Sequence, residues 1–460
     1  MKPLLRWFLF VSLGLALLVA LFYAEEDLRG RHAWQKCKHE FEAKGLVMDW
    51  DKLIPPPVPD DQNFFAASKM QEWFIRNPNF SSDLAKRLAN PRTSAIGTTN
   101  AIVSERDARD YLTWSDQFAP DFNLLRDALK RPYARMDGNY HDPAAMPIPN
   151  FVAVRIVAQT LAQRAHCHLL LNQPEQALAD LTLMHDLCRL LEAGPTGKPM
   201  TLVAAMINVA VAGLYTDTLA EGIRQHAWQE AQLVELQKQF AEVNLTPFVL
   251  EALREEPVHI CREIEIAPRP QFNGLFDMRD RAKWTNKVGW WLWPRGWIYQ
   301  NMVNVAVLEL KPLDGFDLAH DIITPQKFDE ASREFNKFFR RKSPYKRLAA
   351  IVIPNFTRAE QTTAHNQTML NEAQIVCALE RYRLASGVYP SSLDALVPHF
   401  METPPHDIIG GQPLRYRRTD DGKFALYSVG WNEKDDGGQL ETAQTKNSAV
   451  DFTQGDWVWK

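Results

Sequence analysis

The chain has 460 residues, which favours two or three domains and leaves ample material for a hydrophobic core. Hydrophobic residues make up 46% and charged residues 23%, a globular composition that excludes a wholly disordered, collagen-like or multi-span protein. The formal net charge of -4 gives no electrostatic footprint for nucleic acid. We expect the cysteines to be small core residues, because they form neither a disulfide framework nor a CxxC metal motif: Cys37, Cys167, Cys188, Cys261 and Cys377.

The first predicted element is an apolar helix. From Trp7 to Ala24 no residue is charged, and at about 1.5 Å per residue this helix spans roughly 27 Å, enough to cross a bilayer core. Leu18 and Phe22 stand where a cleavage site needs small residues, so we expect an uncleaved single-pass anchor at residues 1–24. A buried core helix is the weaker alternative, because the segment is apolar on every face.

The charges that flank this anchor give conflicting signals about its orientation in the membrane. Three acidic residues follow it directly and favour an outside location for the rest of the chain, but several basic residues come shortly after them. We expect a cytoplasmic N-terminus in the inner (cytoplasmic) membrane, with the body outside the cytoplasm. Residues 25–61 are expected to form a charged helical neck and a proline-rich linker, because the prolines at 54–61 cannot continue a helix.

Residues 62–362 are expected to form a helical domain. Apolar residues recur at helical spacing in four segments, namely Ile156 to Leu171, Pro174 to Glu192, Leu202 to Glu221 and Trp228 to Val243. Two of these segments resemble one tetratricopeptide-type hairpin, because small and large residues alternate as in that repeat at Leu161, Ala165, Ala177 and Leu181. No clear second copy follows, so the sequence favours a helical-hairpin bundle over a repeat solenoid.

Two features of this bundle allow other interpretations. Histidines and cysteines cluster between 166 and 188, but folding the hairpin leaves Cys188 roughly 15 Å beyond the residue opposite Cys167, too far for a shared metal or a disulfide. The apolar segment from Leu202 to Tyr215 suggests a second span, but it is short and contains Asn208. We expect a buried bundle helix there.

Glu255, His259 and Glu263 recur at a spacing of four, which is compatible with acid-base or metal chemistry on one helix face. Pro257 is expected to interrupt that helix, so we favour a solvated charged face. A basic segment from Arg333 to Arg347 is likewise interpreted as a solvated face, here backed by phenylalanines that pack into the core.

Five of the fourteen tryptophans fall between Lys283 and Trp297, next to basic residues. Three interpretations remain open: the rings close the core, they contact a bilayer interface, or they stack on a sugar or a partner chain. The candidate binding surface consists of Trp290, Trp291, Trp293 and Trp297.

The last predicted unit, residues 363–460, is a small α+β domain. A helix begins at Thr363 and ends at Gly387, and a short helix and two alternating strands joined by Asp-Asp-Gly-Lys follow it. Glu380 lies inside the apolar stripe of the long helix, so it should pair with Tyr416, Tyr427 or a nearby arginine. The predicted fold is therefore mainly α, with a transmembrane helix, a helical-hairpin bundle and this α+β domain.

The order ALERYRLASGVYPSSLDALVP, GGQPLRYRRTDDGKFALYSVG and NEKDDGG resembles the globular head of the major pseudopilin of type II secretion systems. The resemblance implies a calcium site formed by Asp435, Asp436 and Asp456, although Asn432 stands where many members have an acid and the loop that follows is longer. No prepilin-like start precedes it, so we expect no pilin-type polymerisation. The preceding residues resemble uncharacterised membrane-anchored proteins of planctomycetes and verrucomicrobia.

Two functions remain open from the sequence. The first is a membrane-anchored extracytoplasmic structural or interaction protein, associated with secretion-system or other envelope proteins and with the lipid bilayer through its first helix. The second is an envelope hydrolase or glycan-binding protein that uses the tryptophan-rich segment, with a carboxylate pair such as Glu255 and Glu263. The chain contains no Gly-x-Ser-x-Gly, His-Glu-x-x-His, phosphate-loop or dinucleotide motif, which favours the first.

Overall fold

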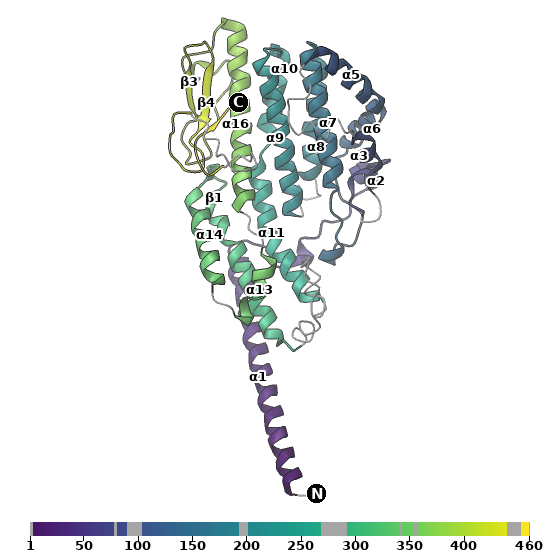
Figure 1. Cartoon of the computed structure of the whole chain (residues 1–460), viewed down its shortest axis with the longest axis vertical. Coiled ribbons are helices and arrows are strands. Elements are labelled where there is room, and N and C mark those ends of the chain that lie inside the picture. Colours follow the sequence, from purple (N-terminus) through teal and green to yellow (C-terminus); the bar gives the residue numbers. More distant parts are fainter. Residues whose placement is uncertain are drawn as a thin grey trace.

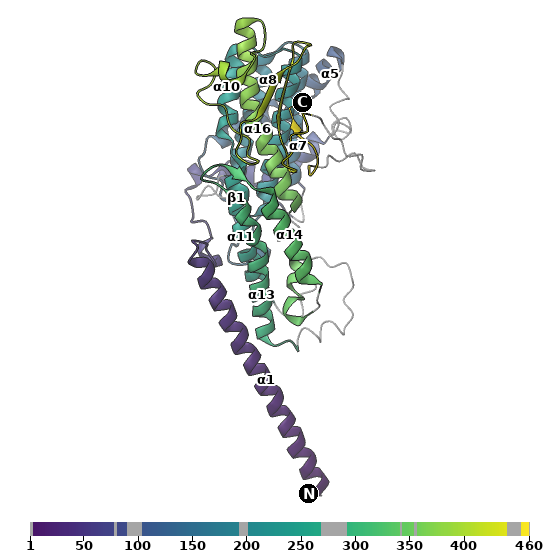
Figure 2. The same ribbon diagram turned by 90° about the vertical axis from the view of Figure 1, so that its left-hand side faces the viewer.

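The computed structural model describes residues 3–77, 81–89, 104–192, 201–267, 292–340, 343–353, 357–438 and 452–459. A single helix, α1 (Pro3–Glu42), projects from one end of an elongated helical body (Figure 1). A quarter turn of the molecule shows α1 leaving the body beside α13 (Arg295–Glu309) (Figure 2). The chain is therefore an apolar rod attached to a helical body.

The end of the body far from the rod is a bundle of long helices that lie side by side (Figure 1). These are α7 (Phe151–Leu170), α8 (Pro174–Glu192), α9 (Leu202–Arg224), α10 (Glu230–Glu242) and α16 (Thr357–Ser386). The side chains of Asn150 and Thr201 accept hydrogen bonds from the first turns of α7 and α9, which fixes where those helices begin. The predicted helices of the bundle are confirmed.

The α7–α8 hairpin forms the centre of the bundle core. The residues that carry the tetratricopeptide-like pattern are all fully buried there: Leu161, Ala165, Ala177 and Leu181. Shorter helices cover the outer side of this hairpin, namely α2 (Met70–Phe74), α3 (Asp83–Leu88) and α5 (Glu105–Ser115) against α7, and α6 (Ala119–Leu129) against α8. Single 3₁₀ turns connect this region at Trp50–Lys52, Asp60–Gln62, Phe64–Ala66, Asp116–Phe118 and Pro143–Ala145.

The end of the body nearest the rod has its own hydrophobic core. It is built from α11 (Leu245–Ile266), α13, α14 (Pro325–Phe339) and α15 (Ala349–Val352), together with the second half of α1. Trp34 and Cys37 of α1 are buried in this core, so the charged segment after the apolar run packs against the body. Two 3₁₀ turns, Lys311–Gly315 and Pro344–Lys346, and a two-stranded sheet, β1 (Phe316–Asp317) with β2 (Ile322–Ile323), complete this end.

A small antiparallel sheet of order β3-β4-β5 lies beside α16 (Figure 1). Its strands are β3 (Arg415–Arg418), β4 (Phe424–Ser428) and β5 (Trp457–Val458). The predicted hairpin is confirmed, with Arg415 opposite Tyr427 and Gly422 at the positive φ of +79° that the turn requires. The predicted short helix is a 3₁₀ turn, Leu393–Leu396, and Ser392 precedes it without a side-chain capping bond.

The structure also tests four expectations about the helical body. All five cysteines are buried thiols outside any disulfide, and α9 is a mostly buried bundle helix, so both predictions are confirmed. The predicted interruption at Pro257 is wrong, because α11 is continuous through it. The predicted solvated face is also wrong: Glu255 is only 5% exposed, and His259 and Glu263 are mostly covered by neighbouring residues.

Candidate functional site

The first candidate site is the junction between α1 and α13. Residues 6–22 of α1 are exposed along their whole length, whereas Tyr23 is partly covered and Glu26 and Gly30 are buried. The apolar part reaches a mean hydropathy of 2.3, and none of that window is buried. Burial therefore begins where the apolar run ends, at the position the sequence predicts for the end of the anchor.

Glu26 is the centre of this junction, and only 4% of it is exposed. Its carboxylate accepts hydrogen bonds from Arg29 (2.8 Å), from the indole nitrogen of Trp297 (2.9 Å) and from the Tyr345 hydroxyl (3.1 Å). These three partners come from α1, α13 and the turn after α14. A buried carboxylate with three donors ties the elements together and avoids the cost of an unpaired charge.

Two glycines let the helices approach closely at the same place. A Cβ atom on Gly296 would lie 1.8 Å from the Glu26 carbonyl oxygen, and one on Gly30 would lie 2.3 Å from the Gly296 carbonyl oxygen. Asp27 in turn accepts a hydrogen bond from the Gly296 amide (2.7 Å), one of the free N–H groups at the start of α13. The junction is thus a close backbone contact that larger residues would force apart.

The tryptophan-rich segment contributes to this junction. Trp293 is 8% exposed and belongs to the core near the rod, while Trp297 is half-buried against Phe22 and Tyr345. Trp293 and Trp297 also pack edge to face, with ring centroids 5.5 Å apart. Trp290 and Trp291 lie outside the described residues. The two described rings therefore support the interpretation in which tryptophans close the core.

The acidic loop of the predicted calcium site lies at the end of the small sheet. Asp456 accepts hydrogen bonds from the backbone amides of Asp436 (3.2 Å) and Gly438 (2.6 Å), while Asp435 accepts one from the Tyr427 hydroxyl (3.1 Å). Burial raises the pKa of Asp456, and the nearby Asp436 and Asp435 raise it further, so the structure brings the three aspartates together.

These aspartates already have partners inside the chain. Asp436 accepts a hydrogen bond from Asn432 (3.1 Å), the residue at the place where many pseudopilins have an acid. The longer part of the loop, from Gln439 to Val450, lies outside the described residues. Among the residues that are described, no group of three or more His, Cys, Asp or Glu side chains is arranged to hold a metal ion. Calcium binding at this loop stays a prediction.

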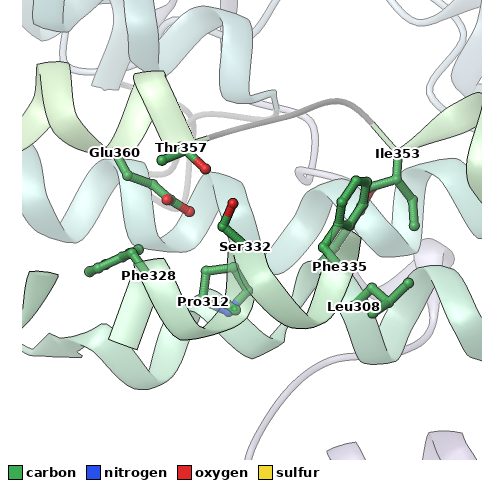
Figure 3. Close-up of a pocket in the computed structure, with 10 residues that line it drawn as sticks. Leu308, Pro312, Phe328, Ser332, Phe335, Ile353, Thr357 and Glu360 are labelled. Atoms are coloured by element: carbon green, nitrogen blue, oxygen red, sulfur yellow. The ribbon is translucent and has the colours of Figure 1, made fainter. Parts of the chain in front are cut away.

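A pocket that the sequence did not indicate lies where α13, α14 and the start of α16 meet, and we call it the waist pocket (Figure 3). It holds about 420 Å³ of empty space, counting its open mouth. Its apolar wall consists of Leu308, Pro312, Phe328, Phe335 and Ile353. Four polar side chains also line it, those of Glu309, Ser332, Thr357 and Glu360, and Figure 3 shows Glu360 and Ser332 pointing into the same space.

The two glutamates of the waist pocket are each 3% exposed. Neither oxygen of Glu309 has a hydrogen-bond partner within the described residues, and Oε1 of Glu360 has none either. Burial raises the pKa of Glu360 to about 8. Burial also raises the pKa of Glu309 well above its ordinary value, and the nearby Glu256 adds to that shift. Both groups are therefore held largely neutral near pH 7.

A second pair of buried titratable groups lies on α11. The His259 ring and the Glu263 carboxylate are 3.7 Å apart, and the His259 ring packs on Trp50. Burial lowers the pKa of His259, while burial together with Glu256 and Asp142 raises the pKa of Glu263 to about 7. Both side chains are mostly covered by neighbouring residues.

Glu380 is fully buried, as its place in the apolar stripe predicts. The predicted arginine partner is confirmed as Arg383 (2.6 Å), but the other donors are Tyr389 (2.7 Å) and His226 (3.0 Å) in place of Tyr416 or Tyr427. Burial alone would raise the pKa of Glu380, and the bonds from these partners lower it below its ordinary value.

The sequence contains a signal for the burial of Glu309 and Glu360, of the same kind as the one for Glu380. Glu309 follows Val305 by four residues and Glu360 precedes Ala364 by four, so each carboxyl stands in line with a fully buried side chain on its helix. The sequence cannot show that these two helices place their acids beside one cavity.

The chain matches no protein-family model, no curated protein and no solved structure. The described elements define a mainly helical protein with a candidate membrane-spanning helix at its N-terminus. The resemblance of residues 363–460 to a pseudopilin head stays a prediction.

Proposed function

We propose that this protein is a membrane-anchored structural or interaction protein, in which α1 inserts into the cytoplasmic membrane and holds the helical body outside the cytoplasm. On this proposal the body offers its surfaces to other envelope proteins, such as components of a secretion or surface-assembly system.

The observation that carries the proposal is the division of α1 into two parts within one uninterrupted helix. The side chains of residues 6–22 are exposed, although the Phe22 ring at the end of this stretch packs on Trp297, and a helix that is apolar on all faces is unfavourable in water. The second part is packed against α13 through Glu26 and Gly30. A bilayer is the environment that would cover the exposed part while leaving the packed part in place.

A hydrolase needs catalytic side chains that its substrate can reach. The His259–Glu263 pair and the glutamates of the waist pocket are mostly buried, which disfavours the hydrolase alternative. A glycan-binding role would rest on Trp290 and Trp291, because Trp293 and Trp297 pack within the body. The sequence lacks the common catalytic motifs, and the rings of Trp293 and Trp297 pack within the body. Both observations favour the interaction protein.

The test is membrane attachment of the full chain with a topology reporter fused after Lys460. We expect the protein to resist carbonate extraction and the reporter to be active only outside the cytoplasm. Replacing Leu13 and Leu17 with Asp should release a folded protein, because both side chains are exposed and contribute nothing to the body.

The matched control is Val203→Asp, which changes an exposed residue on α9, the second helix long and apolar enough to cross a membrane. This variant should stay membrane-bound. Release of the unaltered chain by carbonate, or cytoplasmic activity of the reporter, would overturn the proposal.

A further inference from the structure

We propose that the end of the body nearest the rod rests on the membrane surface and binds the headgroups of anionic phospholipids. We call this surface the base, and its residues are Leu292, Arg295, Lys337, Arg340 and Lys346. The inference rests on the proposed insertion of α1, but it holds on whichever side of the bilayer the body lies. It adds a lipid class and a second membrane contact to the anchor.

The first step of the argument is the depth of the base relative to the apolar run of α1. The Tyr23 hydroxyl donates a hydrogen bond to the Leu292 carbonyl, so the residue before α13 lies beside the end of that run. Glu26, which binds Trp297 and Tyr345, lies only about 5 Å further along the helix axis. The headgroup layer is roughly 5–8 Å deep on each side of a bilayer. These contacts therefore occur at headgroup depth when the apolar run spans the hydrocarbon core.

The second step is that the end of α14 is fixed beside the same place. Asn304 of α13 donates a hydrogen bond to the Tyr345 carbonyl (2.7 Å), which holds the turn after α14 against α13. In that turn the Lys346 ammonium donates to the Phe338 carbonyl (3.1 Å) and lies 3.6 Å from the centroid of the Phe338 ring. Figures 1 and 2 both place the start of α13 and the end of α14 at the part of the body from which α1 projects. The last turn of α14 therefore belongs to the base.

The third step is the charge of the base. The sequence contains no acidic residue between Glu334 and Glu360, so the end of α14 and the turn after it carry basic charges alone. Arg295, Lys337 and Arg340 are exposed, and none of them forms an ion pair within the described residues. Glu334 itself pairs with a lysine of the turn after α13. Anionic headgroups would neutralise this surplus of positive charge.

Three acidic residues of α1 lie at the same depth, and they reduce this charge without cancelling it. Glu26 is balanced by its ion pair with Arg29 (2.8 Å). Asp27 accepts a hydrogen bond from the Gly296 amide, and Glu25 is exposed. The base sets four basic side chains against these last two acids, so its described residues stay net positive.

The fourth step is the apolar and aromatic content of the base. Leu292 is 53% exposed, directly beside the end of the apolar run. Trp297 and Tyr345 are half-buried there and pack edge to face, with ring centroids 5.9 Å apart. Exposed leucine, aromatic rings with a polar atom and basic side chains together are typical of a membrane–water interface. The base thus combines the features of such an interface with the charge that selects anionic lipids.

The test is chemical labelling of lysines on the full chain in nanodiscs, with a neutral acetylating reagent and mass spectrometry. One set of discs contains phosphatidylcholine alone, and the other also contains phosphatidylglycerol. Lys337 should react roughly fivefold more slowly in the anionic discs, and the difference should disappear in high salt. Lys327, an exposed lysine in the first turn of α14, lies roughly 15 Å further along that helix and should react equally in both.

Arg295→Gln combined with Arg340→Gln removes two charges from the base and leaves Lys337 as the reporter. We expect this double variant to lose most of the slowing in anionic discs. The matched control, Arg106→Gln combined with Lys423→Gln, removes the same charge from exposed residues of α5 and of the turn between β3 and β4. It should react as the unaltered chain does.

Recovery of the chain in discs of phosphatidylcholine alone reports on α1, so it separates this inference from the proposed function. A chain that enters neither kind of disc would overturn both. A chain that enters both kinds but is labelled equally fast at Lys337, or is slowed equally at Lys337 and Lys327, would overturn the lipid assignment and leave the anchor intact. Slowing that persists in high salt, or an equal response of the two double variants, would do the same.

Discussion

Two glutamates on one helix, Glu360 near the start of α16 and Glu380 near its end, are buried to nearly the same extent but have opposite surroundings. Glu380 accepts hydrogen bonds from Arg383, Tyr389 and His226, and its pKa is lowered despite burial. Glu360 faces the waist pocket, and burial raises its pKa to about 8. The difference shows that burial alone does not decide whether a carboxyl group is charged. Hydrogen-bond donors around the group can outweigh burial and keep it ionised.

The largest expected effect concerns Glu360 and pH. An unfolded glutamate has a pKa of 4.5, so the raised pKa stabilises the fold fully below about pH 4.5, and this contribution is lost as the pH rises through about 8. Glutamine does not ionise, so the Glu360→Gln variant does not lose this stability as the pH rises. Relative to the unaltered chain, its free energy of unfolding should therefore increase between pH 5 and pH 9 by on the order of 4 kcal/mol.

Chemical denaturation of the full chain at several pH values measures this difference, with the exposed Glu330→Gln on α14 as the control. A difference that does not change with pH would mean that Glu360 ionises normally in the folded protein.

The next effect concerns the partnered carboxylate. Glu380→Leu should lower the free energy of unfolding by about 3 kcal/mol, because it leaves the buried Tyr389 hydroxyl and the Arg383 charge without their acceptor. Glu380→Gln, which keeps an acceptor, should cost less. Urea unfolding at pH 7 compares the two. A more stable Leu variant would show that desolvation of the carboxylate outweighs its bonds.

Glu26 extends the comparison to the junction of α1 and α13, where a buried carboxylate has donors from three elements. Glu26→Gln should weaken the docking of α1 by about 2 kcal/mol, because bonds to the ionised form are replaced by weaker neutral ones. Faster hydrogen exchange in residues 27–42 is the expected readout. The exposed neighbour Glu25→Gln should exchange as the unaltered chain does.

The smallest expected effect is at the acidic loop. If calcium binds Asp435, Asp436 and Asp456, it should raise the melting temperature of the full chain by a few degrees, equivalent to about 1 kcal/mol, because these carboxylates already have partners without it. Replacing Asp435 and Asp436 with Asn should remove the response. Identical melting with calcium and with chelator would leave an ordinary hydrogen-bonded turn.

Local patterns predicted much of the helical framework. Apolar spacing located α7 to α10, and a charge-free run located the exposed part of α1, because both signals come from neighbours along one helix. The stripe around Glu380 predicted its burial and an arginine partner for the same reason.

The sequence failed where distant segments meet. Pro257 predicted an interruption of the helix, and the charged residues beside it predicted a solvent-exposed face. Instead, α11 continues through the proline, and α13 and the segment after α1 cover it. Tertiary packing alone brings His226 to Glu380, which is 154 positions away in the sequence. It also forms the waist pocket, which Glu309 and Glu360 both line. Periodicity within one helix carries no information about such contacts.

The continuity of α1 has a mechanical consequence. At about 1.5 Å per residue its 40 residues form a stiff shaft of about 60 Å, without a joint between the exposed apolar half and the half clamped to α13. If the bilayer sets the tilt of that shaft, as it does for membrane-spanning helices in general, the body must tilt with it. If α1 spans a bilayer as proposed, the small sheet beside α16 would swing through an arc whenever the membrane thins or thickens.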